Sequence, residues 1–217
     1  MPVIDAQIHA YERNRPERPW ATTPDWPPEM TGDDMVREMA KVGVDGAIFV
    51  SAFSMYRFDA SYAVEVRNKF PNKFALVKPV DPNDPGVVET IEDWAKTDGA
   101  VGIRLMFDRF ASSDPAHAGT KRVLDAAARL GLPINLLCWG MLEEMKPWFA
   151  AARDDVKLVI DHLGMKQPAA KPVPPAAESF ADLPLLLDLA RHRNVVVKIT
   201  GACTYSEKPY PFPDIWD

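Results

Sequence analysis

The sequence predicts an α/β fold in which parallel strands alternate with helices and close into a barrel. Seven short runs rich in Val, Ile and Phe recur along the 217 residues, and a helical segment separates each run from the next. Such runs are typical of buried parallel strands, which lose the alternation of apolar and polar residues because both faces are covered. No strand is followed by a GxGxxG or GxxxxGK[ST] loop, so an open nucleotide-binding sheet loses its main support and a barrel is favoured.

The first predicted strand, VIDAQIHAY, covers residues 3–11. The other six strands are predicted at residues 47–52, 74–80, 101–107, 133–139, 156–164 and 195–201. The helices between them are predicted at residues 31–43, 59–70, 85–96, 119–131, 141–153 and 181–193. Each helix is bounded by residues that favour such ends: Thr31, Asp59 and Asp182 as N-caps, and Gly43, Gly99 and Gly131 as stops. Pro147 and Pro184 fall near helix starts, where proline costs little, or kink the helix.

Two long segments interrupt this alternation. Residues 12–30 follow the first strand and residues 165–180 follow the sixth, and both segments are rich in proline. Long structureless segments in compact domains are usually functional or disordered. Because both follow strands that end in a histidine, we expect them to cover a binding site. We find no internal repeat and no linker, so residues 1–217 are predicted to form a single barrel domain.

Composition excludes several classes of protein. The chain is 47% hydrophobic and 26% charged, which suits a globular protein with a core, and its net charge of -6 comes without a basic cluster. We therefore expect no nucleic-acid partner. No apolar run approaches the roughly 18–20 residues of a membrane span, and no signal peptide is evident, so we expect a cytoplasmic protein without a membrane partner. Cys138 and Cys203 show no CxxC pairing and are predicted to be core thiols in a reducing compartment.

Polar residues gather at the C-terminal ends of the predicted strands, which is where barrels of parallel strands place their active sites. These residues are His9, Lys78, Asp81, Arg104, Asn135, Asp161, His162 and Lys198. Along the first strand, Asp5, Gln7 and His9 alternate and should share one face. A single histidine at a strand end is about as often a structural hydrogen-bonding group as a functional one. Two such histidines, His9 and His162, favour a functional site.

Three cations at the predicted strand ends have two interpretations. Arg104, Lys78 and Lys198 either form ion pairs with Asp81 or Asp161, because an unpaired buried charge is costly, or they hold a small anionic substrate. Tyr56 and Arg57 lie in a predicted loop after the second strand and are candidate substrate contacts.

Four segments resemble a known family. The segments are, in chain order, IDAQIHAY, VGIRLMF, VIDHLG and VVVKITG. Their order and spacing are similar to those of the amidohydrolase-related metal-dependent hydrolases (amidohydrolase 2). Within that family they resemble the lactonase-like branch, which opens pyrone dicarboxylate and sugar-acid lactones. The resemblance implies a (β/α)₈ TIM barrel and hydrolysis of a small carboxylated or sugar-acid lactone. It implies catalytic roles for His162, His9 and Gln7. Arg104, Lys78, Tyr56, Arg57, Asn135 and Lys198 are then the expected substrate-binding residues.

Two departures from the family pattern affect the residues that would bind a metal ion. The family's first strand usually ends in His-x-His, whereas Gln7 stands here in place of the first histidine, and the strand at 133–139 contains no histidine. An amide is a poor replacement for imidazole on zinc. We therefore expect a divalent ion, zinc or manganese, to be weakly bound by His9 and His162 or to be absent.

The last departure concerns the end of the sequence. The family carries a catalytic aspartate in a Gly-Ser/Thr-Asp-Trp segment of the eighth strand, and no such segment occurs here. A barrel of this class has about 250 residues, so we expect a barrel truncated after strand seven, with the general base missing. The strand edges left open would favour a homo-oligomer. Two alternatives to lactone hydrolysis stay open: a zinc-dependent decarboxylase of an aromatic or muconate-type acid, and a non-catalytic barrel that binds small acids.

Overall fold

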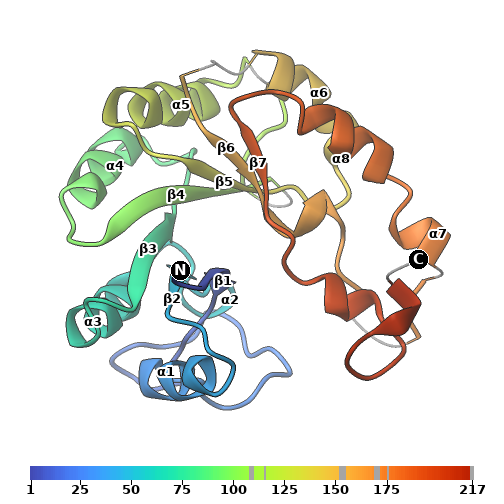
Figure 1. The fold of residues 1–217 in the computed structure, drawn as a ribbon. Helices are drawn as coiled ribbons and strands as arrows, with labels where there is room; N and C mark the ends of the chain where they lie inside the picture. The colour runs from blue at the N-terminus through green and yellow to red at the C-terminus, as the bar shows by residue number, and fades with distance from the viewer. Residues whose placement is uncertain (108–109, 115, 152–154, 169–171, 175, 216–217) are drawn as a thin grey trace. The chain divides into compact units, whose positions relative to one another are not determined.

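Figure 1 shows the fold as a computed structural model, which describes residues 1–217 except 108–109, 115, 152–154, 169–171, 175 and 216–217. The chain forms two compact units. The N-terminal unit comprises residues 1–81 and 89–104, and the C-terminal unit comprises residues 82–88 and 105–217. Strand β4 (Ala100–Met106) begins in the first unit and ends in the second.

The N-terminal unit consists of successive strand–helix repeats. Its elements are β1 (Ile4–Ile8), α1 (Gly32–Lys41), β2 (Gly46–Val50), α2 (Phe53–Tyr56), α3 (Ser61–Lys69), β3 (Phe74–Pro79), α4 (Val87–Ala95) and the start of β4. Neighbouring strands pair in chain order and all in parallel, β1 with β2, β2 with β3, and β3 with β4. Phe49 and Leu76 are opposite each other in β2 and β3 and are fully buried. The predicted alternation of parallel strands and helices is confirmed in this unit.

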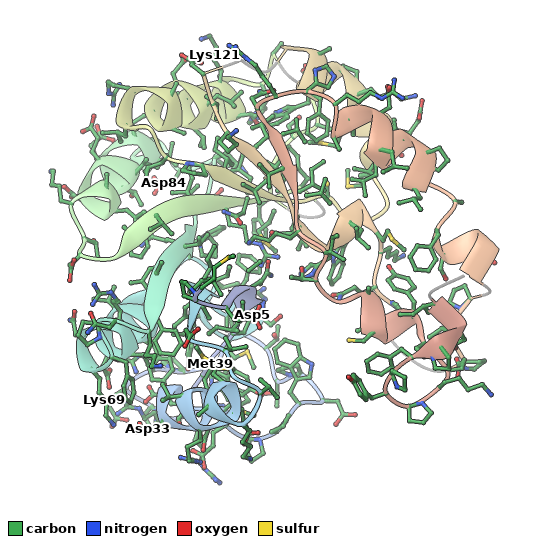
Figure 2. The ribbon with its side chains drawn as sticks, viewed as in Figure 1. Asp5, Asp33, Met39, Lys69, Asp84 and Lys121 are labelled. Carbon is green, nitrogen blue, oxygen red and sulfur yellow. The ribbon has the colours of Figure 1, made fainter. Side chains whose placement is uncertain are left out.

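Helix α1 begins where the sequence predicts and is tied to α3. The Thr31 side chain accepts the Asp34 N–H, and the Asp34 carboxylate accepts the Thr31 N–H, which makes a reciprocal capping box. Figure 2 shows Lys69 of α3 beside Asp33 of α1, and their side chains form an ion pair at 2.7 Å. Met39 faces inward from α1 and is 4% exposed. The predicted cap at Thr31 is therefore confirmed.

The C-terminal unit continues the same pattern. Its elements are the end of β4, α5 (Ala118–Leu130), β5 (Ile134–Leu137), α6 (Leu142–Ala151), β6 (Leu158–Ile160), the 3₁₀ turn η1 (Asp161–Gly164), α7 (Ala176–Ser179), α8 (Leu183–Leu189), β7 (Val195–Val197), η2 (Ala202–Tyr205) and η3 (Pro213–Ile215). β5 pairs with β6 and β6 with β7, again in parallel. The Phe107 N–H, just past β4, donates to the Leu137 carbonyl at 2.9 Å. Gly131 ends α5 in the left-handed conformation, as predicted.

Four predicted elements are clearly too long, and the first of them is the strand predicted at 3–11, which spans only Ile4–Ile8. The strand predicted at 156–164 ends at Ile160, because His162 and Leu163 have positive φ angles of 53° and 58° that are incompatible with a pleated ladder. The strand predicted at 195–201 ends at Val197, and the helix predicted at 181–193 covers only Leu183–Leu189. The alternation rule that placed Asp161 and His162 on opposite faces of a strand therefore does not apply to them.

Other corrections concern single residues. Cys203 is exposed on η2 and was wrongly predicted to be a core residue, whereas Cys138 is buried as expected. Pro147 lies inside α6 rather than at its start, while Pro184 lies in the first turn of α8. In the described part of the chain, no helix is both long and apolar enough to cross a membrane.

The two long segments differ in the structure they adopt. Residues 12–30 contain no helix, and their ends are joined by hydrogen bonds between Tyr11 and Met30 of 2.7 and 2.9 Å. The second segment includes the short helix α7, and residues 169–171 and 175 of it lie outside the described residues. The expectation that these segments cover a site stays a prediction.

Candidate functional site

His9 directly follows β1 and is held through one ring nitrogen. Its Nδ1 lies 2.8 Å from the carbonyl oxygen of Val50, the last residue of β2. Because a carbonyl oxygen can only accept, Nδ1 must carry the hydrogen, and Nε2 of the neutral ring is left with a lone pair. Gln7 agrees with this assignment, since its amide Nε2 lies 3.4 Å from His9 Nε2 and can donate to it. The backbone thus fixes His9 as a hydrogen-bond acceptor at Nε2.

An irregularity in β1 accompanies this arrangement. The pairing register between β1 and β2 shifts between Asp5 and Ile8. The Asp5 carboxylate accepts the backbone N–H of Gln7 at 2.9 Å. Such irregularities re-aim side chains at strand ends. The prediction that Gln7 and His9 share one side of the strand is confirmed by their contact, whereas Asp5 is used to hold the backbone.

The two predicted cations of the N-terminal unit have different surroundings. Arg104 is only 4% exposed, and it lies opposite Pro79 in the β3–β4 pairing. The Lys78 ammonium lies 5.9 Å from the centre of the Trp94 ring, which belongs to α4. Burial lowers the pKa of Lys78 from its usual value, partly offset by the charge of Asp59. Lys78 is therefore packed toward a helix, as a cation–π contact requires.

Tyr56 and Arg57, also predicted to contact substrate, close helix α2. The Tyr56 hydroxyl accepts the Glu12 N–H at 3.0 Å, and burial raises the pKa of this phenol. Arg57 has a positive φ of 52°, and its guanidinium lies 5.2 Å from the Phe53 ring centre. These contacts give Tyr56 a clear structural task, since it anchors the start of segment 12–30.

The C-terminal unit contains a buried ion pair beside its candidate histidine. Lys198 Nζ lies 3.1 Å from Asp161 Oδ1, and the two side chains are 5% and 0% exposed. One partner follows β6 and the other follows β7, so the pair joins the ends of neighbouring strands. The alternative that Lys198 forms an ion pair with Asp161 is confirmed.

His162 sits in a strained turn that β7 supports. Its φ and ψ are 53° and 41°, in the left-handed region that non-glycine residues rarely adopt. The Leu163 N–H donates to the Lys198 carbonyl at 3.1 Å, and the Lys198 N–H donates to the Ile160 carbonyl at 2.9 Å. His162 Nδ1 lies 2.9 Å from Thr200 Oγ1. Backbone strain of this kind, roughly 1–3 kcal/mol, persists where the surroundings enforce it and is common at functional sites.

Two further side chains lie on β5 or just after it. Asn135 is 3% exposed and is opposite Val159 of β6. Cys138 is fully buried, and burial, with a smaller effect from the charge of Asp161, raises the pKa of its thiol to about 12. Cys138 is therefore protonated at neutral pH and is not a nucleophile in this state.

Thr200 is the residue that the sequence reasoning missed. It stands two positions after Lys198 in the VVVKITG segment, and that spacing from a candidate cation was the only available signal. Its contact with His162 depends on the turn at Asp161–Gly164, which pattern alone does not predict.

The residues that the structure describes do not fit a typical metal centre. Among them, no group of three or more His, Cys, Asp or Glu side chains is placed to hold an ion. Gln7 stands where a second imidazole of β1 would be needed.

Parallel strands with helices between them define the fold class as α/β, and the solved structures that it resembles include a TIM barrel. A probable 2-pyrone-4,6-dicarboxylic acid hydrolase from Acinetobacter baumannii with bound citric acid is 17% identical, with a TM-score of 0.74, over 96% of this chain and 74% of that chain. An amidohydrolase from Burkholderia multivorans with bound zinc is 20% identical, with a TM-score of 0.72, over 95% and 72%. An uncharacterised TIM-barrel protein from Bordetella bronchiseptica is 13% identical, with a TM-score of 0.58, over 77% and 58%.

These identities establish the fold alone, and the family follows from the sequence. The amidohydrolase family profile matches residues 4–217, so the chain belongs to the amidohydrolase family. No curated protein matches the sequence. The (β/α)₈ TIM-barrel class and the family expected from the strand segments are therefore confirmed.

Proposed function

We propose that this chain is a hydrolase that opens a small lactone carrying a carboxylate. The observation that supports it most is the strained His162 turn, which Thr200, the Lys198 backbone and the buried Asp161–Lys198 pair hold in place. A turn supported in so many ways presents an imidazole with a fixed orientation. Fixed hydrogen-bond donors stabilise the oxyanion that forms when water attacks a lactone carbonyl.

The substrate class is inferred from charge and from the relatives. Arg104 is a buried guanidinium, and its planar fork suits a carboxylate. The Acinetobacter relative is named for a pyrone dicarboxylic acid, and its structure contains citric acid, which is also a polycarboxylate. Both observations favour an anionic substrate over a neutral sugar. Lys78, Tyr56, Arg57, Asn135 and Lys198 stay predicted substrate contacts, although Tyr56 and Lys198 already have structural partners.

The roles proposed for the two histidines differ. In the neutral ring, His9 Nε2 carries the lone pair, so His9 is suited to accept a hydrogen bond, from the Gln7 amide at 3.4 Å or, when that amide turns away, from water or a substrate hydroxyl. It is not suited to donate to the carbonyl oxygen. That donor role falls to His162, and Gln7 holds His9 Nε2 through its amide.

The test is turnover of two carboxylated lactones, 2-pyrone-4,6-dicarboxylate and a glucaric acid monolactone, followed by proton release. The proposal expects hydrolysis of at least one of them, and a loss of about 10²–10³-fold in His162→Ala. His192→Ala is the matched control, because His192 is exposed on the same unit. Near-wild-type rates in His162→Ala would end the assignment, and binding without turnover would identify the non-catalytic alternative.

A metal-dependent decarboxylase is the second candidate. The Nδ1–H bond from His9 to a backbone carbonyl is the arrangement that metal-binding histidines use, and the Burkholderia relative was crystallised with zinc. Elemental analysis of protein purified without chelator decides between the two. About one zinc or manganese per chain, with release of carbon dioxide from an aromatic acid, would replace the lactonase proposal.

A further inference from the structure

The contact between Thr200 and His162 bears on which nitrogen of the imidazole carries the proton. A neutral imidazole has one donor nitrogen and one acceptor nitrogen. The Thr200 hydroxyl at 2.9 Å from Nδ1 can either donate to that nitrogen or accept from it. The two arrangements give opposite chemistry at Nε2, which is a donor in the first and an acceptor in the second.

The hydrogen-bond partners of Thr200 distinguish the two arrangements. Within the described residues, the Thr200 hydroxyl has His162 Nδ1 as its hydrogen-bond partner. If Nδ1 carried the hydrogen, the partly buried threonine O–H would have to donate to solvent, because no protein acceptor lies within its reach among the described residues. Donation from Oγ1 to Nδ1 satisfies both groups within the protein, and we take it as the favoured arrangement.

Gly201, the residue after Thr200, leaves space for the His162 ring beside the Thr200 hydroxyl. Gly201 has a φ of 72°, and a Cβ added to it would lie 2.0 Å from Gln167 Nε2 and 3.3 Å from His162 Nδ1. A side chain at this position would have to displace the Gln167 amide and would crowd the imidazole edge. Thr200 and Gly201 together thus form the surface against which the Nδ1 edge of His162 rests.

From this geometry we infer that Thr200 is a positioning residue, which donates to His162 Nδ1 and holds the ring as the tautomer with its hydrogen on Nε2. The inference rests on the proposed function in one respect, because that tautomer is the one able to donate to a lactone carbonyl. It adds a residue to the site that the sequence pattern did not identify. It also makes the two candidate histidines, His9 and His162, opposite tautomers.

The first test needs no turnover. Long-range ¹H–¹⁵N spectra at pH 8.5, where an unperturbed imidazole is neutral, report the tautomer of each of the four histidines. The His162 signals are identified by their absence in His162→Ala. We expect His162 with hydrogen on Nε2 and an Nδ1 shift that moves in Thr200→Val and returns in Thr200→Ser. Hydrogen on Nδ1 of His162, or an Nδ1 shift unchanged in Thr200→Val, overturns the inference.

The second test is kinetic and uses the lactone that is turned over. Thr200→Val should lower kcat about tenfold with little change in KM, and Thr200→Ser should restore most of it. Thr204→Val is the matched control, because its hydroxyl donates to the Gly201 carbonyl at 2.7 Å on the exposed η2 turn. Equal rates for the Val and Ser variants contradict the inference. If neither lactone is turned over, the proposed function fails while the spectra still decide the role of Thr200.

Discussion

The two candidate histidines are held in different ways, one in each unit. His9 bonds through Nδ1 to the backbone carbonyl of Val50, whereas His162 bonds through Nδ1 to the side chain of Thr200. A carbonyl leaves no choice of tautomer, but a hydroxyl can take either role. In the N-terminal unit, the backbone therefore fixes the tautomer of His9. In the C-terminal unit, the tautomer of His162 depends on a neighbouring side chain, that of Thr200.

The interactions next to the two histidines also differ, because they are ionic near His162 and neutral near His9. Beneath His162 lies a buried ion pair between Asp161 and Lys198. Beside His9 the support is neutral, because buried Ser51 donates to the Asp59 carbonyl at 2.8 Å and so fixes the end of β2. We expect the C-terminal turn to be the more sensitive of the two to substitution.

The largest expected effect comes from removing one partner of the ion pair. Asp161→Ala leaves the ammonium of Lys198 buried without its carboxylate, which should lower the free energy of unfolding by about 3–5 kcal/mol. Urea unfolding measures it, with Asp188→Ala as the control, since Asp188 is 72% exposed and 4.0 Å from Arg191. The control should change by no more than about 0.5 kcal/mol. A loss below about 1 kcal/mol in Asp161→Ala would show that the turn does not depend on the pair.

A smaller effect is expected beside His9. Ser51→Ala leaves the Asp59 carbonyl without its buried donor and should cost about 1–2 kcal/mol. The tautomer of His9 should nevertheless be unchanged, because the Val50 carbonyl still accepts its Nδ1–H. Ser61→Ala, which removes an exposed hydroxyl bonded to the Asp59 carboxylate, is the control for stability. A shift of His9 to the Nε2–H tautomer in Ser51→Ala would remove the distinction between the two units.

The smallest effect concerns Lys78 and depends on pH. Burial lowers the pKa of Lys78, so between that pKa and the usual value of 10.5 the unfolded chain binds more protons than the folded chain. In this pH interval the contribution of Lys78 to the free energy of unfolding rises with pH. At a pH below the folded-state pKa, Lys78 is charged in both states, and burying its charge destabilises the fold fully. Lys78→Met should therefore unfold at a slightly higher urea concentration than wild type at pH 7, and the gain should shrink as the pH approaches 10.5.

The control for Lys78→Met is Lys41→Met, at an exposed position on α1. The difference between Lys41→Met and wild type in the urea concentration of unfolding should not shrink in the same way as the pH approaches 10.5. If Lys78→Met is less stable than wild type at pH 7, the contact with the Trp94 ring outweighs the cost of burial.

Local sequence was enough to predict most elements. The runs of β-branched residues identify the strands, Thr31 with Asp34 identifies the start of α1, and Gly131 identifies the end of α5. These features act through neighbouring residues, so the sequence states them directly. The ends of β6 and β7 could not be predicted in this way, because the apolar pattern continues past Ile160 and Val197 while the backbone turns.

The sequence by itself determined the β/α alternation, the family and the candidate residues His9, His162 and Arg104. Only the tertiary structure decided what these residues do to one another: that Lys198 pairs with Asp161, that Tyr56 anchors the chain at Glu12, and that Thr200 meets His162. The reason is physical. Strand and helix propensities depend on residues a few positions apart. Each of these contacts, in contrast, joins residues that are 37 to 44 positions apart. Such a contact exists only once the strands have paired.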